Sequence, residues 1–461
     1  MSFIKNYFAD YRSPGGIKDL LVMAFPMMIS TACDGVMTFT DRLFLSRVDS
    51  FQMNAALGGG ITYQMMIFFF VGLTGYSTAL VAQYYGAKDY KNAPKAAFQA
   101  ILITIIAWPV VLILKPFVSS LFYKINLPAE QIGYQVQYLN ILAWGGIFGL
   151  LRQTMSCYFT GIGKVKIVMS ATITAMLVNV FLDYIFIFGK FGFPQMGVRG
   201  AAFATVAGGF SAVIILVFAY FNIANRVKFF VLQSFHFDWK IMKKLIHFGY
   251  PAGLEFLLNF MAFFAMTAMF QARGASEATA ITIMFNWDLV SYIPLLGIEI
   301  AVTSLVGRYM GAGKPELAHK SAISAVKTGM LYSSVVLILF LTIPEMLVRV
   351  FHPDTPSEVF EGAVPLAVTM IRIASLYVLA QAVMVAFVGT LRGAGDTFYT
   401  MVISILANWA FLPLLYLSLY VFDLPIPYGW LAIVVVYLTF CFVIYKRFHS
   451  GKWKSINVLD S

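Results

Sequence analysis

The chain has 461 residues, of which 60% are hydrophobic and only 11% are charged, and its mean hydropathy is +0.81. A soluble protein of this length could not bury so much apolar surface, so the composition predicts an integral membrane protein. The net charge of +11 is dispersed over several loops and forms no single patch, which gives no support to a nucleic-acid-binding role.

Apolar segments long enough to cross a bilayer follow one another along the whole chain. We expect twelve spans, at residues 17–45, 52–84, 94–122, 131–158, 166–189, 198–222, 243–272, 277–309, 317–349, 361–391, 397–421 and 427–447. The two termini, the even-numbered loops and the adjoining ends of the segments carry 22 of the 32 Lys and Arg, and the loops and segment ends of the opposite side carry 8. This asymmetry predicts a multi-pass protein of a bacterial-type inner membrane with both termini in the cytoplasm.

Two stretches of the chain repeat each other at a constant offset. Residues 78–101 and 303–326 share ten identities in 24 positions, among them Gly86 with Gly311, and a second echo relates residues 160–163 to 391–395. We therefore expect an all-α protein of two related six-helix lobes in parallel orientation, with a cavity between them. The predicted lobes are residues 1–222 and 243–461, the second ending in a basic cytoplasmic tail. Residues 223–242 form a cytoplasmic linker, and an amphipathic stretch there fits the anionic inner leaflet as an alternative.

The first segment carries a polar stripe. Asp34, Thr38 and Asp41 recur at positions i, i+4 and i+7, and therefore share one helical face. A carboxylate in hydrocarbon costs about 2.5–3.5 kcal/mol on insertion scales, so it needs a wet cavity, a partner or a bound ion. The alternative is that Asp41 has no functional role and lies at a solvated helix end beside Arg42.

In the second segment, the run Gly58–Gly59–Gly60 has two readings. Close helix packing or a bend is favoured over an unwound stretch that binds an ion.

Two polar residues interrupt the fifth segment one turn apart. Asn179 and Asp183 lie on one face, and at about 1.5 Å per residue they reach a depth similar to that of Asp41 and of Thr205 on segment six. Carboxylate, amide and hydroxyl oxygens suit a hard cation such as Na⁺, and two nearby carboxylates also hold a proton. We expect this group to couple an ion to transport.

The second half has polar residues of its own within the segments. Glu255 and Asp288 lie at about 15 Å depth from opposite sides, where they are expected to face one another across the cavity. Asn259, Gln381 and Arg372 extend a possible substrate or secondary polar site, to which Asp34 also belongs. The alternative is a structural ion pair between Arg372 and one of the acids.

Several motifs together resemble the multidrug and toxic compound extrusion (MATE) family. They are TDRLFLSRV, TALVAQYYGA, NVFLDYIFIFG, GVRGAAFAT, GYPAGLEFLLNF, VGRYMGAG and LRGAGDT, and they run along nearly the whole chain. The resemblance implies an exporter of bulky, often cationic compounds driven by Na⁺ or H⁺, with the coupling cation at Asp41, Asn179, Asp183 and Thr205. The second half departs from the NorM branch at Asn259 and Gln381, where that branch has acids, so the chain resembles the DinF-like branch more closely.

The sequence therefore predicts a cation-coupled antiporter that works by alternating access, and no enzyme. Small amphipathic or cationic molecules are the expected substrates, and membrane lipids surround the protein, which is expected to be a monomer without a cofactor. A flippase for lipids or lipid-linked oligosaccharides on the same fold is the first alternative, and it would favour a cavity lined by Arg and Lys. An intramembrane enzyme is the second, although the chain shows no catalytic pair.

Overall fold

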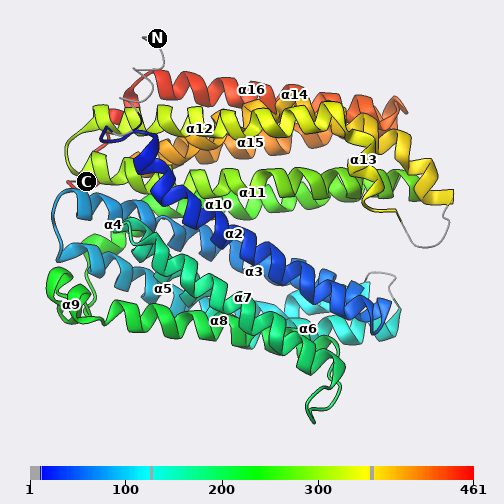
Figure 1. The fold of residues 1–461 in the computed structure, drawn as a ribbon, viewed down its shortest axis with the longest axis horizontal. Helices are drawn as coiled ribbons and strands as arrows, with labels where there is room; N and C mark the ends of the chain where they lie inside the picture. The colour runs from blue at the N-terminus through cyan, green and yellow to red at the C-terminus, as the bar shows by residue number, and fades with distance from the viewer. Residues whose placement is uncertain (1–10, 12, 125–127, 353–357, 461) are drawn as a thin grey trace. The chain divides into compact units, whose positions relative to one another are not determined.

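The computed structural model describes residues 11, 13–124, 128–352 and 358–460. Within these ranges all regular secondary structure is helical (Figure 1). The predicted all-α membrane fold is confirmed.

Long helices occupy each of the predicted spans. In the described ranges they are α2 (Ile17–Ser46), α3 (Ser50–Gly75) with α4 (Ser77–Gly86), α5 (Asn92–Ser120), α6 (Ala129–Gly161), α7 (Val165–Phe188), α8 (Val198–Tyr220), α10 (Trp239–Gln271), α11 (Ala275–Gly311), α12 (Pro315–Thr342), α14 (Glu358–Ala394), α15 (Thr397–Tyr416) and α16 (Ile426–His449). Eleven of these spans are long and apolar enough to cross a membrane. The twelfth, α6, has 33 residues but is more polar and contains Arg152.

The predicted ninth span, 317–349, is not one helix. It ends at Thr342, and a short helix, α13 (Pro344–Arg349), follows. Proline has no N–H to continue the hydrogen-bond ladder and disfavours the helical conformation in the residue before it, so Ile343, with φ −129°, lies outside both helices.

The chain forms two compact units. Unit 1 contains residues 1–24, 257–306 and 314–457, and unit 2 contains residues 25–256, 307–313 and 458–461. The chain passes from one unit to the other within α2, α10 and α11. The predicted lobes were defined by the internal repeat and these units by contacts, so the division into lobes stays a prediction.

In unit 2, α6 packs against α3, α5 and α8, and α8 packs along α7 (Figure 1). Glycines allow the close approach of α7 and α8: a Cβ at Gly208 would lie 2.8 Å from the carbonyl oxygen of Ala175. Glycines also bring α3 onto α6, because a Cβ at Gly58 would meet the Gln135 side chain and one at Gly59 would lie 3.1 Å from Tyr138. The helix-packing interpretation of this glycine run is confirmed.

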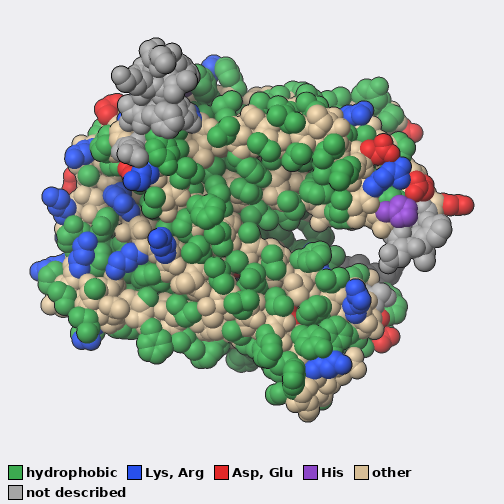
Figure 2. Space-filling view, in the orientation of Figure 1, with side chains coloured by type: hydrophobic (Ala, Val, Ile, Leu, Met, Phe, Trp, Pro, Cys, Tyr) green, Lys and Arg blue, Asp and Glu red, His purple; other side chains and the backbone are tan. Residues whose placement is uncertain are grey.

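In unit 1, α14 packs between α12 and α16, and α15 lies against α16. Its core contains Phe270, Tyr377, Phe411 and Trp430. Across the visible face of the molecule, hydrophobic side chains cover most of the surface along the helices (Figure 2). Such a surface suits lipid as a solvent.

The internal repeat is visible as the same glycine contact made twice. In unit 2, a Cβ at Gly161 would lie 2.9 Å from the carbonyl oxygen of Thr78, and in unit 1 a Cβ at Gly393 would lie 2.5 Å from that of Thr303. Thr78 and Thr303 are equivalent positions of the repeat. The predicted relationship between the two halves is confirmed at these positions.

Candidate cation site

Three helices of unit 2 bring together three of the predicted site residues. Asp41 of α2 accepts a hydrogen bond from Asn179 Nδ2 of α7 at 3.2 Å on one carboxylate oxygen. It accepts another from Thr205 Oγ1 of α8 at 3.0 Å on the other oxygen. Asp41 is only 6% exposed, so the alternative of a solvated helix end is wrong.

Asp183, one turn along α7 from Asn179, lies in the same place but is bonded differently. It is fully buried, and in the part of the chain that the structure describes neither of its carboxylate oxygens has a hydrogen-bond donor. Its carboxyl group lies beside that of Asp41. Two carboxyl groups form a hydrogen bond only when one of them holds a proton, since ionised carboxylates are acceptors alone.

The site therefore has more acceptors than donors. The side-chain oxygen of Asn179 is also buried without a donor among the described residues. Buried acceptors without a partner are costly in an apolar environment, and a proton or a hard cation would satisfy them. By the chemistry of its oxygen atoms, the arrangement suits a proton or a hard cation.

Sequence reasoning missed Tyr138 of α6. This buried side chain lies beside the two carboxyl groups and Thr205, and its ring packs against Gly59 of α3. Two features of the sequence could have identified Tyr138. The fourth predicted segment is more polar than the others, and the glycine run of the second segment leaves room for a large side chain on the helix that packs against it.

The two acids of the polar stripe on α2 have different hydrogen-bond partners. Asp34 accepts a hydrogen bond from Arg152 Nη1 of α6 at 2.9 Å, an ion pair in which Asp34 is half-exposed. Asp34 is therefore bonded apart from Asp41, although both lie on one helical face.

In unit 1, Asp288 of α11 accepts hydrogen bonds from two side chains of α14. Tyr377 Oη donates at 2.9 Å and Gln381 Nε2 at 3.3 Å, both to the same oxygen. Asn259 donates to Ser404 Oγ at 2.7 Å. The structure thus joins Asp288 with Gln381 and bonds Asn259 elsewhere.

The remaining predicted residues are placed as follows. Arg372 is exposed and makes no ion pair within the described ranges, so the alternative of a structural ion pair between Arg372 and an acid is wrong. Glu255 is buried in unit 2, whereas Asp288 belongs to unit 1, and their facing one another stays a prediction. An unforeseen ion pair joins Glu299 of α11 to Arg392 of α14.

Unit 2 also has an apolar pocket of about 310 Å³. It is lined by Asn140, Ile141, Trp144, Gly145, Phe203 and Val206 of α6 and α8. No carboxylate lines it, so it does not compete with the cation site.

The chain was compared with known families and proteins. The MatE family model matches residues 26–185 and 251–417. A relative from Thermotoga maritima, described as "Probable multidrug resistance protein NorM", is 28% identical over 469 residues, which cover 99% of this chain and 97% of that protein. The "Multidrug resistance protein PmpM" of Pseudomonas aeruginosa is 25% identical, with 85% of this chain and 82% of that protein covered.

Solved structures show the same fold. A crystal structure of MATE in complex with MaL6 superposes with a TM-score of 0.86 at 20% identity, covering 96% of this chain and 98% of that one. A transporter of the MOP superfamily from Pyrococcus furiosus superposes with a TM-score of 0.85 at 20% identity and the same coverage, and its description says that reversed polarity of its binding pocket suggests a different function.

Proposed function

The chain belongs to the MatE family, and from this premise we propose that it exports bulky, often cationic organic compounds in exchange for an inward-moving cation, H⁺ or Na⁺. The relatives described as multidrug resistance proteins support export, and we propose no enzymatic activity. The observation that carries the coupling proposal is the buried pair of Asp41 and Asp183, in which Asp183 has no donor among the described residues.

The coupling ion binds at Asp41, Asn179, Asp183 and Thr205 from the outer side. Because these residues belong to α2, α7 and α8, an ion bound to them draws three helices together. The ion changes drug affinity only if it binds one arrangement of these helices more tightly than another. Alternating access between two lobes follows from that difference.

The chain acts as a monomer in a bacterial-type inner membrane with both termini in the cytoplasm, a placement supported by the distribution of Lys and Arg. We also keep the proposal that it is closer to the DinF-like branch than to NorM. Asn259 and Gln381 support it, since both are amides where acids are expected for NorM coupling in the second half.

A lipid or oligosaccharide flippase is the second candidate, and one observation weighs against it. A pyrophosphate substrate needs several free cations in the cavity, but of the two arginines within the segments Arg152 is neutralised by Asp34, which leaves Arg372 alone. An intramembrane enzyme has no support from the polar groups described, because none pairs a nucleophile with a base.

The proposal is tested with purified protein in liposomes under imposed Na⁺ or H⁺ gradients, following efflux of a fluorescent organic cation. We expect Asp183→Asn to abolish the response to the gradient that drives the parent, since an amide neither releases a proton nor neutralises a cation. Glu358→Gln, which changes an exposed carboxylate at the start of α14, is the control and should respond like the parent.

If Asp183→Asn responds to both gradients as the parent does, the coupling assignment is wrong. If the parent transports anionic lipid-linked sugars and no organic cation, the proposal of an exporter is wrong and a flippase is the function supported.

A further inference from the structure

A second group of charges lies outside the cation site, in unit 2. It consists of Lys91, Lys164, Lys228 and Arg308 with the rings of Tyr85, Tyr90, Phe229 and Phe230, here called the basic–aromatic cluster. Its members come from the end of α4, the loop before α5, the loop before α7, the short helix α9 (Ile223–Phe229) with the residue after it, and the end of α11. In the view of Figures 1 and 2, basic side chains gather at the end of unit 2 that carries α9.

The cations converge because they share aromatic faces. Lys228 Nζ lies 5.3 Å from the ring centre of Tyr85, and Arg308 Cζ lies 5.0 Å from the same ring. Lys228 Nζ also lies 5.4 Å from Phe229, whose ring centre is 5.9 Å from Lys164 Nζ. Cation–π contacts hold charge weakly and do not neutralise it, so the positive charges reinforce one another.

The three lysines of the cluster have no carboxylate partner in the part of the chain that the structure describes. Within the described ranges Lys91, Lys164 and Lys228 form no ion pair, and Lys164 Nζ donates only to Asn225 Oδ1 at 3.4 Å. Burial lowers the pKa of Lys164 below its usual value, and the positive charge of Lys228 lowers it further. An anion placed here would relieve this repulsion.

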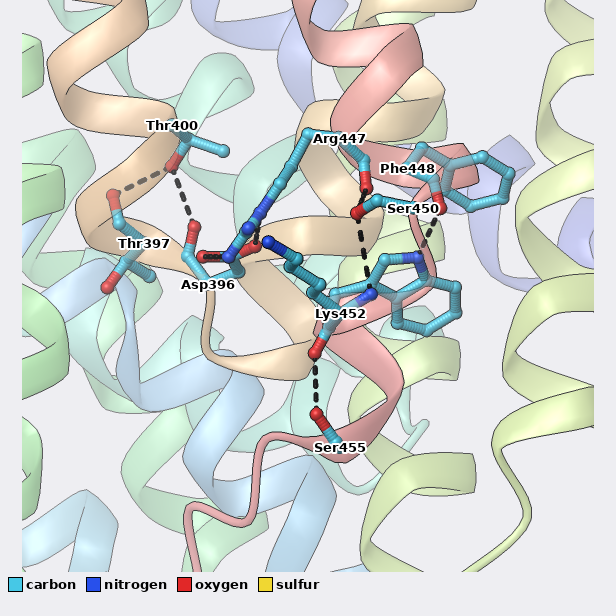
Figure 3. A network of polar contacts seen from close by, with 9 residues as sticks. Asp396, Thr397, Thr400, Arg447, Phe448, Ser450, Lys452 and Ser455 are labelled. Atoms are coloured by element: carbon cyan, nitrogen blue, oxygen red, sulfur yellow. Dashed lines mark hydrogen bonds and ion pairs between the residues drawn. The ribbon is translucent and has the colours of Figure 1, made fainter.

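The repeat-related place in unit 1 is built in the opposite way. There the residue after the glycine turn is Asp396, which accepts two hydrogen bonds from Arg447, at 2.7 Å and 3.1 Å (Figure 3). The corresponding residue of unit 2 is Lys164. In unit 1, Asp396 therefore neutralises Arg447. In unit 2, the corresponding position is itself a cation, Lys164.

Helix α9 adds an apolar edge beside these cations. Ile223 and Val227, one turn apart, are 76% and 72% exposed, while Asn225 and Phe229 on the opposite face are buried. Asn225 fixes this orientation by donating to the Tyr220 carbonyl oxygen at 2.9 Å. A short helix with exposed apolar residues next to lysines is typical of a segment that lies in a membrane interface.

We propose that the basic–aromatic cluster binds the phosphate of an anionic phospholipid, whose acyl chains lie along Ile223 and Val227. The phosphodiester accepts hydrogen bonds from Lys164 and Lys228, and its negative charge offsets theirs. These loops are on the side that the distribution of Lys and Arg makes cytoplasmic, where bilayers present anionic lipids. This inference does not depend on the coupling ion or on the exported substrate.

Native mass spectrometry of the purified full chain tests the proposal, with phosphatidylglycerol and phosphatidylcholine as the two probes. The parent should retain phosphatidylglycerol preferentially. A lysine near the surface contributes about 1 kcal/mol to such binding, so Lys164→Gln/Lys228→Gln should bind phosphatidylglycerol at least about tenfold more weakly and phosphatidylcholine as before.

Lys115→Gln/Lys190→Gln removes the same charge from unit 2 outside the cluster and should keep the preference of the parent. Lys228→Glu changes an exposed residue, so it reports on binding even if the partly buried Lys164 is needed for folding. Ile223→Ser/Val227→Ser should weaken retention of both lipids. The proposal is overturned if the lysine variants keep the preference, or if glycerol phosphate at equal concentration displaces the lipid, since the site would then hold a free phosphate compound.

Discussion

At the scale of single residues, the cation site depends on which carboxylate oxygens have a hydrogen-bond donor. Both oxygens of Asp41 receive one, from Asn179 and Thr205, and neither oxygen of Asp183 does within the described residues. Asp41 is therefore held in position by the protein, and under the proposed coupling Asp183 is the group that an incoming ion or proton would satisfy. The two acids contribute unequally even though they are chemically alike.

The first prediction concerns Thr205, whose hydroxyl donates to Asp41 at 3.0 Å. Thr205→Val keeps the shape of the side chain but removes the donor, which leaves a buried carboxylate oxygen less well solvated at a cost of about 1–3 kcal/mol. We expect the ion concentration for half-maximal efflux to shift by about tenfold. Thr205→Ser keeps the hydroxyl and should shift it far less, so equal effects of Ser and Val would contradict the assigned role. The measurement is efflux from liposomes over a series of Na⁺ and H⁺ concentrations.

At the scale of helices, glycines decide where the elements touch. Gly86 at the end of α4 packs on the backbone carbonyl of Arg308, and Gly311 at the end of α11 packs on that of Gln83. Gln83 and Arg308 are equivalent positions in the repeat, so the two helix ends cross with local twofold symmetry. A side chain at either glycine would meet backbone, which cannot move aside.

The second prediction follows from this crossing. Gly86→Ala and Gly311→Ala should each lower the free energy of unfolding by about 2 kcal/mol, because overpacking against backbone forces the helices apart. Gly149→Ala in α6 is the matched control, since nothing lies within 4 Å of the added Cβ, and it should be neutral or stabilising. Thermal unfolding in detergent measures all three. Similar midpoints for Gly86→Ala and Gly149→Ala would contradict the close crossing.

The helices also show which features of the structure could be predicted from the sequence and which could not. Hydropathy found every long helix, but it joined α12 to α13, because a proline near the end of an apolar run has little effect on hydropathy and a large one on the backbone. Helical periodicity placed Asp34 and Asp41 on one face correctly. It could not separate their partners, Arg152 and Thr205, because contacts between distant helices are not encoded in local spacing.

At the scale of the whole molecule, the two halves share contacts but differ in their acids. Gly161 and Gly393 make the same contact in the two units, whereas Asp183 and Asp288 are bonded in different ways. Asp288 receives donors from Tyr377 and Gln381, so it is stabilised without an added ion. Unit 2 therefore contains a buried carboxylate without a donor among the described residues, and unit 1 contains one whose hydrogen bonds come from the protein.

The third prediction separates the roles of these acids. We expect Asp183→Asn to abolish the response to the driving gradient for every substrate, and Asp288→Asn to leave that response intact, because Asp288 already has its hydrogen bonds within the protein. If Asp288 contacts a cationic substrate, its amide variant should weaken transport of cations by about tenfold, the loss of one charged contact, and leave a neutral analogue unchanged. Efflux of a matched cationic and neutral dye pair under each gradient measures both effects. A gradient response lost in Asp288→Asn and kept in Asp183→Asn would move the coupling site from unit 2 to unit 1.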